Sequence, residues 1–402
     1  AGAYESGNNN IGIGNSTSAL SNGGNNIALG YLSGFSNNGT HNIQIGTFEN
    51  SRNNIGDSNV ALGVQTLRDN IGNNNVAIGS YAATNNVGSG SVMIGGNAGQ
   101  GNTGSNDVII GTIAGVNNTG NLATLIGHSA GYNNKGYQVS ALGYSAGKNI
   151  KLNADYNTTF GAFSGMEYGG IENSSFGYLS GGNVSNTASF LSLFGALSGD
   201  NNTGNNCTLI GALGDGQNNT GDHVTAIGTG INAEGEGRVT ARNNTGDFVI
   251  AVGSAALENN QSDKTIGIGV QAGDIGFGSI SEGSIAIGTE AARQFDISPT
   301  SSIHRIAIGT NAMDVYRGGN YSIGIGYKAL SNNNGDHVIA IGKNAGDTNA
   351  QPNRFIISND ELPSFPDRAT ALASITVALG AAANNTYLYY NASNGAIEAV
   401  RL

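Results

Sequence analysis

The sequence predicts an all-β fold, a parallel β-solenoid of about 20 coils with a repeat of 16 residues. The chain has 402 residues, of which 66 are glycine and only 4 are proline. A four-residue block of large apolar, small, large apolar and glycine recurs along it, and the first copies begin at Ile11, Ile27 and Ile43. A repeat this short encloses a core only by stacking, because each coil then pairs its backbone with the coils above and below.

A second, shorter motif follows many of these blocks. Ser129-Ala130-Gly131 and Asn344-Ala345-Gly346 are examples, and an Asn/Gly corner such as Asn117-Asn118-Thr119-Gly120 comes next. Asn and Gly tolerate the left-handed backbone conformations that tight corners need. Each repeat is therefore predicted to contain a strand, a corner, a short second segment and another corner.

The residue just before the final glycine of each block is Ile, Leu, Val or Phe, which predicts a continuous ladder of core side chains. Where this residue becomes Phe, the other large position shrinks to Thr or Ser, as at Thr158 and Phe160. Such an exchange keeps the volume of each coil constant, so we expect both positions to face the same interior. The predicted ladder includes Ile78, Ile94, Ile110, Phe160, Phe176, Phe194, Ile227 and Ile341.

The middle residue of the block points to the opposite face, because side chains alternate along a strand. It is mostly small or apolar, as at Ala61 and Met93, with Gln44, Thr159 and Ser175 as exceptions. A strand that is apolar on both sides is normally covered on both sides. We therefore expect a parallel homo-oligomer in which this second face packs against further copies of the chain.

These blocks, the Ser/Asn-Ala-Gly motif and the Asn-rich turns resemble the left-handed parallel β-roll heads of trimeric autotransporter adhesins (YadA-like heads) and the related rolls of bacteriophage fibres. The resemblance covers residues 11–346. It implies a left-handed roll and a parallel homotrimer. The Asn-Asn-Thr-Gly corners are more similar to those of phage and free-living bacterial fibres than to those of adhesins.

The predicted organisation is a lead-in at residues 1–10, a β-roll at 11–350 and a C-terminal capping or trimerisation module at 351–402. The last part contains a helical-looking stretch at 367–375 and a hairpin signal at Asn394-Gly395. It is similar to the terminal hairpin modules of phage fibres. A solenoid needs such a cap because its last coil otherwise exposes an unpaired edge. We expect no membrane-anchoring barrel or stalk after the roll, which favours a phage fibre.

Composition argues against several other functions. The net charge of −11 and the scattered Lys and Arg residues disfavour nucleic-acid binding. Cys207 is the only cysteine, and the five histidines form no metal-ligand motif, so we expect no metal, no cofactor and no catalytic residue. No apolar run is long enough to cross a membrane, so no membrane insertion is expected.

Two breaks in the repeat, at 229–246 and 293–305, predict loops that bulge from the roll. Their charged residues are interpreted as solvated loop positions, with receptor or intersubunit contact as the first alternative and carboxylate catalysis as the second. The candidate surface-contact residues are Glu234, Glu236, Arg238, Arg242 and His304.

The sequence thus favours a non-enzymatic structural and receptor-binding fibre, most simply a bacteriophage fibre on the virion surface. Its expected partners are two sister chains, other virion or fibre proteins, and a host receptor that is a glycan or an outer-surface protein. A bacterial surface adhesin or extracellular filament subunit is the alternative. Two further functions are less favoured. An ice-binding solenoid would need Thr or Ser at one constant repeat position, which the chain does not keep, and a glycan-depolymerising tailspike would need a pair of catalytic carboxylates.

Overall fold

The computed structural model describes residues 7–182, 188–212, 215–229, 239–273, 283–295, 304–316, 321–332, 335–348, 351–357, 386–391 and 396–401. The fold is an all-β parallel solenoid of about 19 turns with a period of about 16 residues, and no helix occurs in the described part. The chain divides into two compact units, Ala1–Asn218 and Asn219–Leu402. The helical-looking stretch 367–375 lies outside the described residues.

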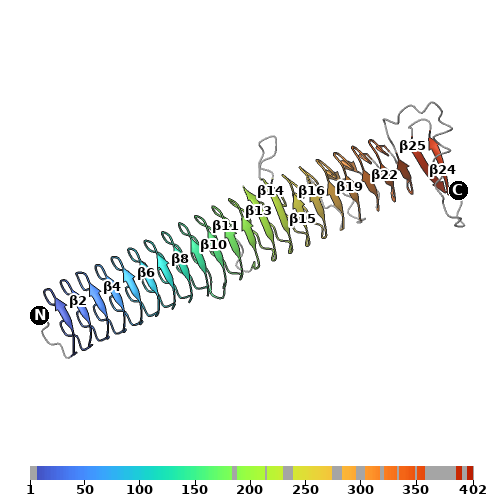
Figure 1. Cartoon of the computed structure of the whole chain (residues 1–402). Helices are drawn as coiled ribbons and strands as arrows, with labels where there is room; N and C mark the ends of the chain where they lie inside the picture. Colours follow the sequence, from blue (N-terminus) through green and yellow to red (C-terminus); the bar gives the residue numbers. More distant parts are fainter. Residues whose placement is uncertain are drawn as a thin grey trace. The chain divides into compact units, whose positions relative to one another are not determined.

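In the first unit each turn contributes one short strand to a parallel sheet (Figure 1). The register follows the repeat, so that Ile11 pairs with Ile27, and Val92 with Val108. The strands are β1 (Ile11–Ile13), β2 (Ile27–Leu29), β3 (Ile43–Ile45), β4 (Val60–Leu62), β5 (Val76–Ile78), β6 (Val92–Ile94), β7 (Val108–Ile110), β8 (Thr124–Ile126), β9 (Ser140–Leu142), β10 (Thr158–Phe160), β11 (Ser174–Phe176), β12 (Ser192–Phe194) and β13 (Thr208–Ala212).

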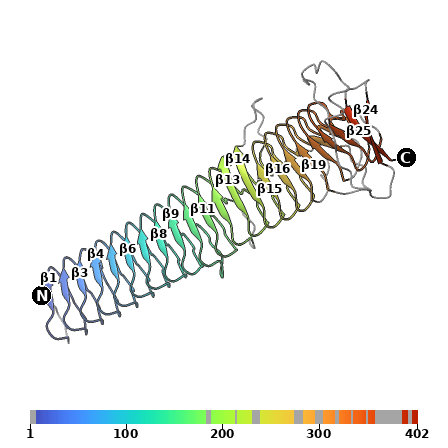
Figure 2. The ribbon, with the colours of Figure 1, turned by 45° about the vertical axis from the view of Figure 1, so that its right-hand side comes forward.

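The second unit has the same pattern of short parallel strands (Figure 2). Two further short strands, β18 and β20, pair with each other in a separate parallel sheet. The strands of this unit are β14 (Thr225–Thr229), β15 (Ile250–Val252), β16 (Ile266–Ile268), β17 (Ile285–Ile287), β18 (Gln294–Phe295), β19 (Ile306–Ile308), β20 (Val315–Tyr316), β21 (Ile323–Ile325), β22 (Ile339–Ile341), β23 (Phe355–Ile357), β24 (Thr386–Asn391) and β25 (Ala396–Arg401). The last two form an antiparallel hairpin, and β25 pairs with β23 in antiparallel register.

The two faces of each strand are the reverse of those expected from the sequence. The middle side chains are buried inside the solenoid, and Ala77, Met93 and Ile109 are all 0% exposed. The residues before the glycine point outward: Phe160 is 51% exposed and Ile341 is 38% exposed. The predicted core ladder is therefore wrong for the single chain. Its members Ile78, Ile94, Ile110, Phe160, Phe176, Phe194, Ile227 and Ile341 are half-buried or exposed.

Inside the coil, the size of the middle strand residue is related to the size of the residue opposite it, six positions later in the sequence. Where the middle residue is large, as at Met93 or Ile109, a glycine of the second motif lies opposite it. A Cβ at Gly99 would be 2.4 Å from the Met93 sulfur, and one at Gly115 would be 2.7 Å from the Ile109 Cδ1. Where the middle residue is small, as at Ala61, the opposite position holds a buried large side chain, Leu67. This exchange keeps the thin core filled without voids.

Buried asparagines stack along the corners of the first unit. From Asn54 to Asn134, each side-chain amide donates a hydrogen bond to the side-chain oxygen of the equivalent residue one coil before, beginning with Asn54 to Asn37 and continuing, for example, with Asn70 to Asn54 at 2.7 Å. The same amide also donates to a corner carbonyl, as Asn70 does to Gly72 at 2.7 Å. Buried polar groups need such partners, so the ladder fixes the corner while satisfying its backbone.

Candidate functional site

The outward strand faces form an extended apolar feature of the described residues. Each turn places a large side chain there just before the glycine, and in many turns a second one precedes it by two residues, as Val92 precedes Ile94. These side chains stack on their equivalents in the next turn. With strands about 4.8 Å apart and three residues spanning about 10 Å, the face of the first unit measures roughly 600 Å² and that of the second roughly 400 Å². The largest apolar patch of an ordinary monomer is about 300–600 Å² and is often functional, so each face is comparable in size to such a patch.

Aromatic side chains reinforce this face in β10–β12. The rings of Phe160 and Phe176 lie 6.1 Å apart, and those of Phe176 and Phe194 are parallel at 4.9 Å. Their partners on the same face, Thr158 and Ser174, are small and half-buried. The exchange of Phe for a smaller neighbour therefore occurs on the outer face of the strands. A constant side-chain volume on this face improves packing only if another protein surface contacts it.

The predicted loop residues do not gather into a site. Glu234, Glu236 and Arg238 lie outside the described residues. Arg242 belongs to a regular turn rather than to a bulge: its guanidinium lies 3.7 Å from the buried carboxylate of Glu258 in the next turn. Residues 239–246 already belong to a regular turn of the solenoid, so the predicted loop at 229–246 extends too far towards the C-terminus.

His304 is exposed and is part of an aromatic column on the second unit. Its ring stacks on Tyr321 at 5.8 Å, and Tyr321 stacks on His337 at 5.2 Å. The three residues occupy the same corner position in successive turns, just before the strand. His304 therefore lies in a regular stacked position of the solenoid.

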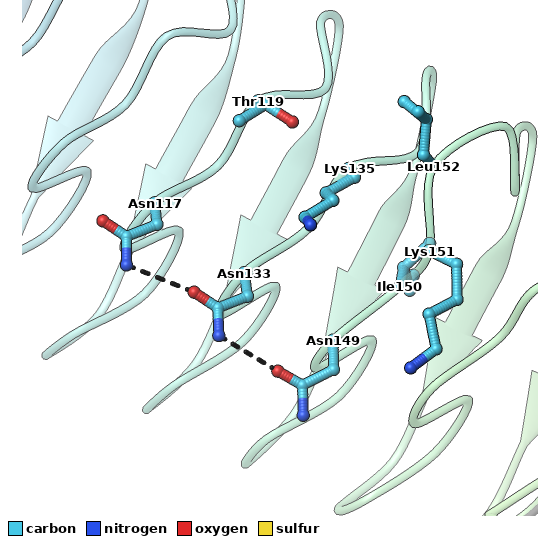
Figure 3. Close-up of a pocket in the computed structure, with 8 residues that line it drawn as sticks. All are labelled: Asn117, Thr119, Asn133, Lys135, Asn149, Ile150, Lys151 and Leu152. Carbon is cyan, nitrogen blue, oxygen red and sulfur yellow. Dashed lines mark hydrogen bonds between the residues drawn. The ribbon is translucent and has the colours of Figure 1, made fainter.

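A groove of about 500 Å³ crosses the corners of three turns in the first unit (Figure 3). Three asparagines form its floor. Asn117 donates to Asn133 at 3.2 Å, and Asn133 donates to Asn149 at 3.2 Å. Among the described residues, the side-chain amide nitrogen of Asn149 donates to no acceptor. The other lining residues are Thr119, Lys135, Ile150, Lys151 and Leu152.

Lys135 and Lys151 occupy the same corner position in adjacent turns. The amide nitrogen of Lys135 donates to the carbonyl of Ile150, and that of Lys151 donates to the carbonyl of Tyr168, which is the same pairing one turn later. Both lysines are exposed. Among the described residues neither forms an ion pair, whereas Arg52 and Arg293 do. Like charges at equivalent positions of adjacent turns repel each other.

A local change in the repeat creates the groove. Ile150 replaces the buried asparagine that would continue the corner ladder after Asn134, and it is 1% exposed. Two extra residues, Leu152 and Asn153, then follow Lys151 before the turn resumes at Ala154. Leu152 projects and is 69% exposed. The sequence interpretation missed this site, although the longer repeat and two lysines at one repeat position were visible in it.

Within the part of the chain that the structure describes, no cluster of three or more His, Cys, Asp or Glu side chains is arranged to hold a metal ion. The same residues contain no helix with the length and apolar character needed to span a bilayer. Burial raises the pKa of Asp107 to about 7, but this carboxyl group accepts hydrogen bonds from the Ala123 backbone and the Asn118 amide and is closed off from solvent. It is a structural residue.

Comparison with known proteins gives no relative for this chain. No protein-family model, no curated protein and no solved structure matches it.

Proposed function

We propose that the chain is a subunit of a non-enzymatic, parallel homotrimeric fibre that attaches a bacteriophage to the surface of its host. The observation that carries this proposal is the outward apolar face of the strands. A soluble chain keeps such a face only if it is covered, and an identical face on a second and third copy is the simplest cover because the repeats match turn for turn.

The size of each face is of the order that a protein interface needs. The face measures roughly 600 Å² in the first unit and roughly 400 Å² in the second, and a stable protein interface takes about 800 Å² from each partner. Its side chains are mostly Ile, Val, Leu and Phe, with Thr or Ser at the first strand position from β8 to β14, and such a largely apolar composition is typical of an obligate interface. The Phe/Thr and Phe/Ser exchange in β10–β12 also supports close packing on this face.

The C-terminal hairpin supports a fibre in a second way. The β25 strand pairs with β23, the last parallel strand, so the edge of β23 is occupied by the chain itself. An occupied edge prevents further strands from adding there. We propose that the hairpin is the cap of the solenoid, and that three chains together present several equivalent contact sites to a host surface, which raises avidity.

The mass of the protein in solution tests the assembly. Wild type is expected at three times the chain mass of 40.5 kDa. The double variant Ile94→Lys/Ile110→Lys places charge on the outward face and is expected at the mass of one chain with an unchanged circular dichroism spectrum. Ile71→Lys is the matched control, because Ile71 is 54% exposed but lies in a corner outside the strands. This control is expected to remain trimeric.

Two results would contradict the proposal. A wild-type chain that is monomeric at micromolar concentration would show that the apolar face needs no partner. A double variant that assembles as well as the Ile71→Lys control would show that the interface lies elsewhere. Incubation with capsular polysaccharide and assay for new reducing ends tests the non-enzymatic part, and release of such ends would refute it.

A further inference from the structure

We infer that the groove lined by Asn117, Asn133, Asn149, Lys135 and Lys151 binds an anionic polysaccharide. This inference rests on the proposed attachment function, because it names the class of surface molecule that the chain would contact. It draws on different residues from those of the assembly face: none of the groove residues belongs to a strand.

The charge of the ligand follows from the two lysines. Their ammonium groups repel each other, and within the described residues no carboxylate compensates either of them. This arrangement occurs in a chain of net charge −11, in which Arg52 and Arg68 are held by Glu49. An anion placed between the two lysines would turn the repulsion into two attractions.

The hydroxyl-rich character of the ligand follows from the floor. The stacked amides of Asn117, Asn133 and Asn149 present donors and acceptors in one row, and the hydroxyl of Thr119 lines the same groove away from this row (Figure 3). An amide group offers a donor and an acceptor at once, which suits paired hydroxyl groups on a sugar ring. The Asn149 amide at the end of the row still has donor capacity for such a ligand.

The shape and the apolar wall complete the argument. Leu152 is the exposed apolar residue that lines the groove, and it can cover the less polar face of a pyranose ring. The groove volume of about 500 Å³ falls in the range of about 300–1,000 Å³ that small-ligand sites occupy. Its floor continues over three turns, so an extended polymer can lie along it rather than only a single sugar.

Binding of fluorescein-labelled oligogalacturonate, a carboxylated glycan, to the full chain tests the inference by fluorescence anisotropy. The fully methyl-esterified oligomer is the neutral control with the same sugars. A labelled phosphomannan, a glycan that carries phosphate groups, tests whether the anionic group is a phosphate instead. We expect at least one of the two anionic polymers to bind and the neutral oligomer to bind much more weakly.

The groove variant is Lys135→Gln/Lys151→Gln, for which we expect about tenfold weaker binding, the effect of losing two exposed charge contacts. The charge-matched control is Lys148→Gln/Lys328→Gln, since these lysines lie over the rings of Tyr132 and Tyr327 outside the groove. This control should bind as wild type does. Asn133→Ala should also weaken binding, because it interrupts the row of amides.

Three outcomes would overturn the inference: no binding of either anionic polymer, equal binding of the neutral oligomer, or equal weakening by the groove and control variants. The last would mean that only net charge matters. The solution mass of every variant is measured in parallel. A monomeric protein whose affinity depends on the groove residues would refute the trimer and leave the groove assignment in place. A trimeric protein whose affinity does not depend on these residues would refute the groove assignment and leave the trimer in place.

Discussion

Replacement of Asp107 by Asn is expected to stabilise the protein at neutral and alkaline pH but not in acid. Asp107 is 1% exposed, and burial raises its pKa from 3.8 to about 7. The same repeat position holds Asn59 and Asn75 in earlier turns, and each donates to a glycine carbonyl of the next turn while accepting from a backbone amide. An ionised carboxylate lacks the donor that these two asparagines use.

The pH dependence follows from the direction of this shift. An acid whose pKa is higher in the folded state than in the unfolded state holds its proton more tightly when folded. The free energy of unfolding of the wild type therefore falls as the pH rises from about 4 to about 7, and it changes little through this group at higher pH. A difference of about three pKa units corresponds to at most about 4 kcal/mol.

Equilibrium unfolding in guanidinium chloride at pH 4 and pH 8, at one chain concentration, measures the effect. The Asp107→Asn variant should unfold at nearly the wild-type denaturant concentration at pH 4 and at a clearly higher one at pH 8. Glu172→Gln, which removes an exposed carboxylate from the same unit, should show no such gain. The reasoning is refuted if Asp107→Asn gains as much at pH 4 as at pH 8.

Two further substitutions test the interior and the corners. Gln44→Met should raise the free energy of unfolding by about 1–2 kcal/mol in denaturant titration, because neither side-chain atom of the buried Gln44 amide has a hydrogen-bond partner; a loss of stability would show that the amide is satisfied. Gly111→Ala should cost about 2 kcal/mol or more, because its φ is +135° and a Cβ would lie 2.4 Å from the carbonyl oxygen of Gly127. Gly96→Ala, with only Thr112 near at 3.9 Å, is the control and should change the unfolding midpoint little.

The strands and their register could be predicted because the repeat itself sets both. Each turn places the same block beside the previous one, so the spacing that pairs Ile27 with Ile43 in the sequence also pairs them in the sheet. The antiparallel strands on either side of Asn394-Gly395 follow from ordinary hairpin patterning as well. Handedness and the number of chains stay predictions.

The choice of face could not be predicted from alternation alone, because both faces of the strand are apolar. The signal that decides it is a size relation between distant positions in one repeat. Met93, Ile109 and Leu125 are each followed six residues later by a glycine, whereas Ala61 is followed six residues later by Leu67. Only residues that share an interior need such complementary volumes.

The corners also differ from the sequence expectation in one respect. Asn and Gly were expected at left-handed positions, but Leu67, Tyr81 and Phe163 adopt φ values of 53°, 60° and 58° there. A left-handed residue with a side chain costs about 1–2 kcal/mol. Backbone hydrogen bonds from turn to turn, such as Leu67 to Ala82 at 2.9 Å, compensate this strain. Such compensation depends on the neighbouring turns and not on local sequence.

The reversed faces change what assembly must do for the chain. The middle residues of the strands fill the interior of a single solenoid, as the close approach of Met93 to Gly99 shows. The larger apolar volume, including the rings of Phe176 and Phe194, lies outside. Folding of one chain and the proposed covering of its outer face by other chains are therefore separate steps, so a substitution such as Ile94→Lys should remove the second without removing the first. Had the large residues been inside, the same lysine would have unfolded the turn.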